Sequence, residues 1–378
     1  QANLAQAVFL QPSAGLAVRV QLRLYRGFFD MWSIRTRCFA LLLVKCIPKL
    51  CDACSGWFMD NGFRLSARTL DNAPTDWIGH SGTGLLVVPR GHKGALGSRA
   101  RFGYVGFFPN PGSSTSQAPR IRMAGLNEVG LSCDEQHLDE TQYQSPTGDT
   151  GVDLPTEHIC EWAVMSFRDC AEVRGALEGV RLVRGTTPIG ADSGHHYTMR
   201  DVSGASLVVE VIDGKVHAYD DFNDGGNTGF GVITNSPPFP WQLEALRLFQ
   251  AKRVAARPAV GVPGAWYSDE RFIRIWMVKS GMPKPRSLAG AVAQAFAVMD
   301  TVTVPMGSQW GTDSDAGDGG DFTIWGAVYD HKAPAVYWRT AENYQPQRVR
   351  LADLDLRAGA PMRAVLLNDT SLPWFGDA

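Results

Sequence analysis

Paired runs of alternating apolar and polar residues, joined by tight-turn sequences, place the strongest constraint on the fold of this chain. In ASLVVEVIDGKVHAYD, two such runs meet at Asp213-Gly214, a pair suited to the positive φ angles of a hairpin turn. SGWFMDNGFRLSART has the same form around Asp60-Asn61-Gly62, GLLVVPRG is a further strand, and FTIWGAVYD with AVYWRT makes a third pair. Alternation with period two predicts strands, and the tight turns predict that they pair antiparallel.

Helical periodicity appears between these strands. Apolar residues recur at spacings of three and four over about Thr156 to Glu178, Trp241 to Ala255, Glu270 to Ser280 and Ser287 to Met299, which predicts four helices. Ser287 is a suitable N-cap. No fixed-period repeat and no Pro- or Ser-rich linker divides the sequence after residue 53. We therefore expect an α+β fold in which residues 54–378 form a single domain of two sheets with helices outside them.

Composition excludes two classes of protein. The chain has 378 residues, a formal net charge of −2 and scattered Lys and Arg, so it lacks the basic stripe that follows a nucleic-acid backbone. No stretch reaches the roughly 18 consecutive apolar residues that cross a bilayer. We expect no nucleic-acid partner and no integral membrane span after residue 53.

Residues 1–53 are predicted to be a leader that is removed on maturation. From Met31 the sequence contains two arginines, an apolar run at 38–44 and the small residue Ala53. That order of charge, hydrophobic run and small-residue cleavage site is typical of a secretory signal peptide. It predicts a secreted or periplasmic protein. The alternative is a poorly structured leader on a cytoplasmic protein.

Other patterns that carry chemistry have simpler explanations. Cys51 and Cys54 form a CxxC that suits a thiol redox pair or half of a zinc site, but strand-like sequence follows it and no second CxxC exists. Asp313, Asp315, Asp318 and Asp321 lie among glycines without the regular spacing of a calcium loop, so an acidic surface loop is expected there. We expect neither a cofactor nor a metal.

Two further sets of residues remain to be interpreted. Ser193 beside His195-His196 suggests a serine hydrolase, but the nearest approach to a GxSxG elbow, GHSGT at 79–83, lacks the last glycine. Solvated or core histidines are the better interpretation. The thiols that follow Cys54 are Cys133, Cys160 and Cys170. Their odd number forbids complete pairing among themselves, so we expect them to be mostly buried and reduced, with room for one disulfide.

Several segments follow one another from Cys54 to Thr340 in an order that suggests a family. They are CSGWFMDNGFRLSARTLD, LLVVPRG, AGLNEVGLS, HYTMRDVSGASLVVEVIDGKVHAYD, GVITNSPPFPWQ, SDERFIRI, TVTVPMGSQ and DFTIWGAVYDHKAPAVYWRT. In sequence and in order, they resemble the choloylglycine hydrolase and penicillin V acylase family of N-terminal-nucleophile hydrolases.

The resemblance implies a four-layer αββα sandwich and an amidohydrolase that cleaves a linear, non-peptide carbon–nitrogen bond of an N-acyl substrate. It implies that Cys54 is the nucleophile, with Arg68 and Asp71 following on the return strand. The TNSP segment supplies Asn235, and the SDERFIRI segment supplies Arg271. The resemblance also suggests a homotetramer.

The proposed roles agree with the chemistry of the residue types. A thiol titrates near ~8.5 and a free α-amine near ~7.7 to 8.0, so an N-terminal Cys54 would supply both nucleophile and base. Arg68 would favour the thiolate, and Asp71 would hold the amine. Asn235 would donate to the oxyanion, with Arg271 as support. Taken singly, Arg68 and Asp71 also suit a cross-strand ion pair. Asn235 suits a turn residue, and Arg271 suits a charge on a helix surface.

Departures from the family pattern leave the substrate open. His137 falls near the position where relatives carry Tyr or Asn beside the scissile bond, so we expect it to contact substrate. Asn72 stands where homoserine-lactone acylases carry an aromatic residue. Penicillin V, conjugated bile salts, N-acyl homoserine lactones and long-chain N-acyl amides all remain candidates. A non-catalytic protein that binds acylated small molecules is a further alternative.

Overall fold

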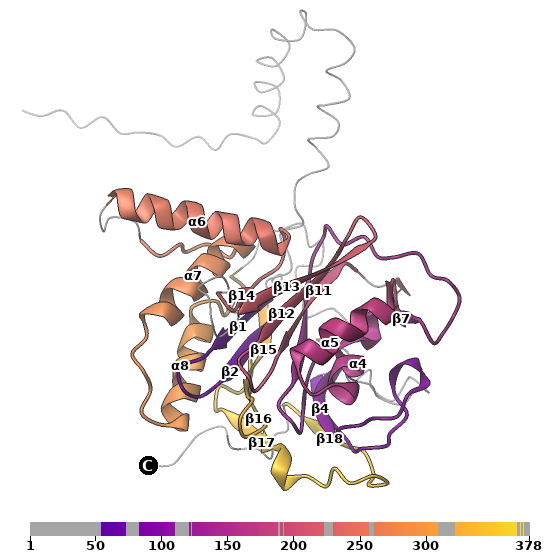
Figure 1. Cartoon of the computed structure of the whole chain (residues 1–378). Helices are drawn as coiled ribbons and strands as arrows, with labels where there is room; N and C mark the ends of the chain where they lie inside the picture. The colour runs from indigo at the N-terminus through magenta and orange to yellow at the C-terminus, as the bar shows by residue number, and fades with distance from the viewer. Residues whose placement is uncertain are drawn as a thin grey trace, which may run out of the picture. The chain divides into compact units, whose positions relative to one another are not determined.

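Two large antiparallel sheets dominate the part of the chain that the structure describes (Figure 1). This computed structural model describes residues 54–72, 83–109, 121, 123–187, 190–191, 193–222, 230–256, 261–308, 322–368, 371 and 373. The first sheet has six strands, in the order β14 (Val232–Ile233), β1 (Ser55–Met59), β2 (Leu65–Asn72), β15 (Phe322–Asp330), β16 (Ala335–Thr340) and β17 (Gln347–Arg350).

The second sheet has eight strands. Their order is β13 (Lys215–Phe222), β12 (Ser206–Ile212), β11 (His195–Arg200), β6 (Ser132–His137), β5 (Ala124–Asn127), β4 (Tyr104–Pro109), β3 (Thr83–Val88) and β18 (Arg363–Leu366). Two small pairs lie apart from it, β7 (Asp153–Pro155) with β8 (Arg181–Val183) and β9 (Thr186–Thr187) with β10 (Gly190–Ala191).

The predicted hairpins are confirmed, because local turn chemistry determines them. Asp213 and Gly214 both have positive φ, 53° and 69°, between β12 and β13, as a two-residue hairpin turn of the mirror-image type requires. Gly62 has a φ of 97° between β1 and β2. The third predicted pair is β15 and β16, in register from Trp325 opposite Thr340 to Asp330 opposite Ala335.

Helices cover the outer face of each sheet, so that both faces of most strands are buried. The helices are α4 (Ile159–Ser166), α5 (Cys170–Ala176), α6 (Phe239–Ala256), α7 (Ser268–Gly281) and α8 (Leu288–Asp300). On β3, Leu86 and Val88 pack with α4 residues, whereas Leu85 and Val87 pack with Trp325 and other residues of the six-stranded sheet. Two buried faces explain why this strand is an unbroken apolar run.

The six-stranded sheet packs its other face against the later helices. Trp57 and Ala67 of this sheet share a buried cluster with Phe272 of α7 and with Ala295 and Met299 of α8. In Figure 1 these helices, coloured orange, lie on the opposite side of the sheets from α4 and α5. The architecture is therefore the four-layer αββα sandwich of the N-terminal-nucleophile hydrolases, as predicted.

One predicted helix is wrong in its extent. The segment from Thr156 to Glu178 breaks into α4 and α5, because Phe167 and Asp169 are extended, and Asp169 accepts the Glu172 amide as the N-cap of α5. Asn127, the last residue of β5, also helps to end α4, because its Nδ2 donates to the carbonyls of Val164 and Phe167 at 2.9 and 2.8 Å. The other three helices are confirmed. Ser287 caps α8 by accepting the Gly290 amide at 3.1 Å.

The cysteines that follow Cys54 are only partly reduced. Cys133 on β6 and Cys160 on α4 form a buried disulfide with Cα atoms 5.1 Å apart, and Cys170 is a buried free thiol. Two of the three thiols expected to be mostly reduced are therefore paired. None of the helices in the described part of the chain has both the length and the apolar character needed to cross a membrane.

Candidate active site

Cys54 lies where β1 begins, beside a buried arginine from the next strand. The register of β1 and β2 places Gly56 opposite Arg68, so the guanidinium of Arg68 reaches back toward Cys54, where its Nη2 lies 3.9 Å from Sγ. Arg68 is fully buried. Its Nη1 donates at 2.8 Å to the carbonyl of Met123, just before β5 of the other sheet, and its guanidinium carbon lies 4.9 Å from the centroid of the Trp325 ring.

These surroundings keep a positive charge beside the thiol. Burial alone would lower the pKa of Arg68, but the neighbouring acidic groups, chiefly Cys54 and Asp134, outweigh it, and the pKa is raised. A fixed guanidinium favours the thiolate form of a neighbouring cysteine. The arrangement therefore suits a nucleophilic sulfur.

Asp71, also on β2, faces the same end of β1. Its backbone carbonyl lies 3.8 Å from Cys54 Sγ. Its carboxylate accepts hydrogen bonds from the hydroxyls of Thr69, at 3.4 Å, and Thr323 of β15. Thr69 in turn accepts the Ser55 amide at 3.1 Å. These hydroxyls hold the buried carboxylate next to the start of β1.

Arg271, on α7, joins the start of β1 to the predicted oxyanion residue. Its Nη1 donates to the carbonyl oxygen of Cys54 and to the hydroxyl of Ser55, both at 2.7 Å. Its Nη2 donates to Asn235 Oδ1 at 2.8 Å, and its Nε donates to the Trp266 carbonyl at 2.9 Å. The side chain is almost fully buried. Arg271 is therefore a bridge inside the site and not a helix-surface charge.

The contact with Arg271 determines which way the Asn235 amide points. Because Oδ1 accepts from Arg271, the NH₂ group faces the end of β6, where it donates to the backbone carbonyl of His137 at 3.1 Å. Asn235 lies in the loop between β14 and α6, just before the cis Ser236–Pro237 bond. One amide hydrogen is used by His137, and the second is available to a ligand oxygen.

The structure places His137 at this site through its backbone. The His137 carbonyl contacts Asn235, whereas the imidazole Nε2 lies 2.8 Å from Asp139 and the ring packs edge-on against His195 at 5.9 Å. Ser193 Oγ lies 3.5 Å from His195 Nε2. His196, one residue on, is fully buried against Glu210, which agrees with the interpretation of a core histidine.

The remaining predicted sites lie largely outside the described residues. These include Cys51, most of the GHSGT segment, Asp313, Asp315, Asp318, Asp321 and the predicted leader. Within the described residues, no group of three or more His, Cys, Asp or Glu side chains could hold a metal ion.

Sequence reasoning did not single out several residues that support the site. Ser55, Thr69, Thr323, Glu210 and Gln242 are all buried and bond to site residues or to the Asn235 loop. Ser55 follows Cys54 and Thr69 follows Arg68 in the sequence, and this adjacency to predicted site residues was the signal that could have identified them. Gln242 ends the GVITNSPPFPWQ segment, and nothing in the sequence shows that it folds back onto it.

Comparisons with known proteins identify the family of the chain. The model of the family described as "Linear amide C-N hydrolases, choloylglycine hydrolase family" matches residues 54–371. The bile salt hydrolase/transferase of Clostridium perfringens is 24% identical over an alignment of 242 residues, which covers 58% of this chain and 70% of that protein.

Two solved structures share the fold. The conjugated bile acid hydrolase of Clostridium perfringens, solved as a mutant, superposes with a TM-score of 0.68 at 20% identity, covering 83% of this chain and 97% of that one. The penicillin V acylase of Agrobacterium tumefaciens superposes with a TM-score of 0.65 at 23% identity, covering 85% and 94%. With the family match over most of its length, the chain belongs to the choloylglycine hydrolase family of linear amide C–N hydrolases.

Proposed function

We propose that this protein cleaves N-acyl amides by nucleophilic attack of Cys54, after removal of residues 1–53. The observation that carries the proposal is the convergence of two buried arginines on Cys54. Arg68 lies beside the sulfur, and Arg271 joins the Cys54 carbonyl to Asn235. The family match also begins at residue 54.

The residues suit each step of an acyl transfer. The Cys54 thiolate attacks the carbonyl carbon of the substrate, and the oxygen gains negative charge that the second Asn235 N–H meets. The carbon–nitrogen bond then breaks, and the amine leaves with a proton from the Cys54 α-ammonium. A thioester remains. Water attacks it and gives one proton to the α-amine, the carbon–sulfur bond breaks, and the carboxylic acid leaves with Cys54 restored as a thiolate beside its α-ammonium.

The supporting residues act through position. Asp71 holds the α-amine that cleavage at Ala53 creates, and its own carboxylate is held by Thr69 and Thr323. Arg271 holds the carbonyl side of the same residue. With both sides of Cys54 fixed, its sulfur and its nitrogen keep one geometry through both half-reactions. His137 contributes its backbone carbonyl to Asn235.

We propose penicillin V and glycine-conjugated bile salts as the first substrates to test, because relatives are named for penicillin V and bile salts. The decisive measurement combines intact mass with turnover. Active material should begin at Cys54, and Cys54→Ala should lose all turnover. Active material that retains Cys51, or a Cys54→Ala rate within tenfold of the parent, would refute the mechanism. A chain that retains Cys51 and binds zinc would favour the thiol alternative.

We also propose that the protein is exported to an oxidising compartment and assembles as a homotetramer. The Cys133–Cys160 disulfide supports export, because such bonds persist mainly in secreted and periplasmic proteins. Cell fractionation after expression of residues 1–378 tests export, and cytoplasmic retention of the active form contradicts it. Light scattering tests the tetramer, and a monomer mass contradicts it.

A further inference from the structure

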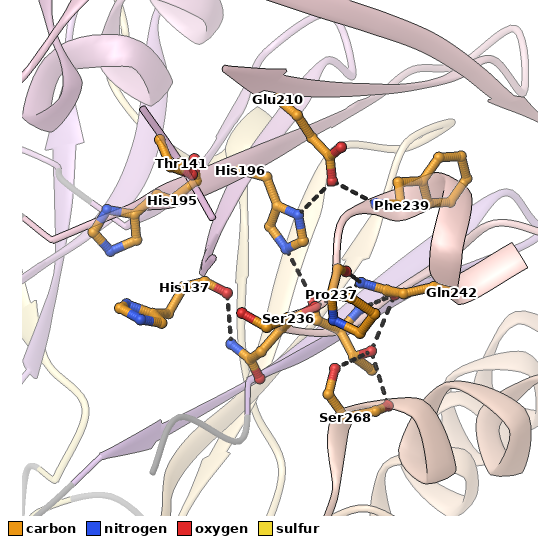
Figure 2. A network of polar contacts seen from close by, with 12 residues as sticks. His137, Thr141, His195, His196, Glu210, Ser236, Pro237, Phe239, Gln242 and Ser268 are labelled. Atoms are coloured by element: carbon orange, nitrogen blue, oxygen red, sulfur yellow. Dashed lines mark hydrogen bonds and ion pairs between the residues drawn. The ribbon is translucent and has the colours of Figure 1, made fainter. Parts of the chain in front are cut away.

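The loop that carries Asn235 is held from the sheet side by a buried histidine–glutamate pair (Figure 2). His196 on β11 places Nε2 2.6 Å from the Thr234 carbonyl oxygen, and its Nδ1 lies 3.0 Å from Glu210 Oε1 on β12. The same Oε1 accepts the Phe239 amide at 2.7 Å. Both side chains are fully buried.

These partners determine where the hydrogens lie. A carbonyl oxygen only accepts, so Nε2 of His196 must carry a hydrogen toward Thr234. Glu210 accepts an amide from the first turn of α6, where the helix N-terminus favours a negative group. The contact between Nδ1 and Glu210 Oε1 thus fixes the orientation of the His196 ring, with Nε2 directed at the Thr234 carbonyl.

Gln242, on α6, holds the same loop from the other side. Its Oε1 accepts the Thr234 amide at 3.1 Å, and its Nε2 donates to the carbonyls of Asn235 and Pro237 at 2.6 and 2.8 Å. The side chain is fully buried. Backbone groups before, at and after Asn235 are therefore bonded by one amide.

Together, these side chains bond to the backbone of Thr234, Asn235 and Pro237, and so hold the loop before, at and after the Asn235 side chain. Three buried polar side chains are costly to desolvate unless their hydrogen bonds are made, and here the bonds converge on the loop backbone. We propose that His196, Glu210 and Gln242 are positioning residues for amide hydrolysis, which hold Asn235 where its N–H meets the developing oxyanion. This inference rests on the proposed function of Asn235.

Two variants test the proposal, each with little change in volume. Glu210→Gln replaces the carboxylate that contacts His196 Nδ1 and the Phe239 amide by a neutral amide, which weakens both contacts. Gln242→Leu removes the contacts to Thr234, Asn235 and Pro237. Because the oxyanion forms only after attack, each variant should lower kcat for penicillin V or glycine-conjugated bile salt about 10- to 100-fold and leave KM nearly unchanged. This loss is smaller than the roughly 10²- to 10³-fold fall in kcat expected when such a donor is removed altogether. Hydrogen exchange of residues 230–242 should become faster in both.

The matched control is Glu161→Gln. Glu161 on α4 is also a buried glutamate near a histidine, with Oε2 4.0 Å from His158 Nδ1 and with Tyr104 donating to its Oε1. It lies on the outer face of the eight-stranded sheet, away from the Asn235 loop. This variant should keep kcat and the exchange rate of residues 230–242, whatever it does to stability.

A double-mutant cycle separates this inference from the proposal on which it rests. In an Asn235→Ala background, Glu210→Gln and Gln242→Leu should lower kcat no further, since they act through Asn235. Folded variants with kcat within twofold of the parent, an equal loss in both backgrounds, or unchanged exchange of residues 230–242 would overturn the positioning role. A normal kcat for Asn235→Ala alone would instead refute the oxyanion role itself.

Discussion

His331 makes acid stability a sensitive test of how the two sheets are joined. The residue follows β15 and is almost fully buried. Its Nδ1 lies 2.8 Å from the Gly130 carbonyl, in the β5–β6 turn of the eight-stranded sheet, and its Nε2 lies 2.8 Å from Ser66 Oγ on β2. The neutral ring satisfies both contacts, with Nδ1 donating to Gly130 and Nε2 accepting from Ser66.

The pKa of His331 is lowered from 6.5 to about 4, chiefly by burial; Arg200 also lowers it, whereas the Gly130 carbonyl and Asp201 oppose the shift. The unfolded chain therefore binds this proton more readily than the folded protein. The stability that the neutral ring contributes is fully present above the unfolded pKa and is lost as pH falls through the folded one. Because each tenfold difference in proton affinity corresponds to about 1.4 kcal/mol, this contribution is about 3 kcal/mol, most of which is lost between pH 7 and pH 4.

The variant His331→Asn isolates this effect, because an asparagine amide can still donate to Gly130 but does not titrate. Urea unfolding of parent and variant, followed by tryptophan fluorescence from pH 7 to pH 4, gives both free energies of unfolding. The advantage of the parent over the variant should shrink by about 3 kcal/mol across this range. His217→Asn, which removes a half-buried imidazole on β13, controls for the loss of any histidine. Parallel pH curves for parent and His331→Asn would refute the reasoning.

Two further predictions concern the catalytic group. Arg68→Lys should slow both turnover and alkylation of Cys54, because an ammonium cannot reproduce the planar fork that contacts Met123, Thr69 and the sulfur together; full rates for both would show that Arg68 has no such role. Asn235→Ala should lower kcat about 10² to 10³-fold with little change in KM. If it is only a turn residue, the melting temperature should fall while kcat stays nearly normal, at a cost of about 1 kcal/mol.

The sequence predicted those elements whose cause is local. The Asp213-Gly214 turn and the Ser287 cap each depend on residues within a few positions, and both are present. The break between α4 and α5 has a local part in Asp169, but Asn127 also caps the end of α4 from a segment about forty residues earlier. A periodicity analysis sees only the apolar spacing on either side and joins the two helices.

The order of strands across each sheet was also beyond local reasoning. β2 pairs with β15, more than 250 residues later, and β1 pairs with β14. These long-range pairings bring Thr323 to Asp71 and place the Asn235 loop beside Cys54. Collinear motifs identified Cys54 and Asn235 without showing that they meet. The contacts that unite them depend on strand order, which alternation does not encode.

The polar supports of the site were missed for a different physical reason. His196, Thr198 and Arg200 occupy alternate positions on β11, where alternation normally indicates a solvent-facing side, yet all three are fully buried. They face the gap between the two sheets. Burial lowers the pKa of Arg200, while Asp134, 3.6 Å away, opposes that effect.

Such a layer is stable only if its charges compensate one another, because each isolated ion would be costly to desolvate. Asp134 lies next to both Arg200 and Arg68. Burial raises its pKa while the two arginines lower it, so its charge depends on the same guanidinium that approaches Cys54. The sulfur and Asp134 therefore share one cation. A row of polar residues on a strand that is covered on both faces thus indicates a site between the sheets. The sequence does not show that the second face of the strand is covered, and only the three-dimensional fold reveals it.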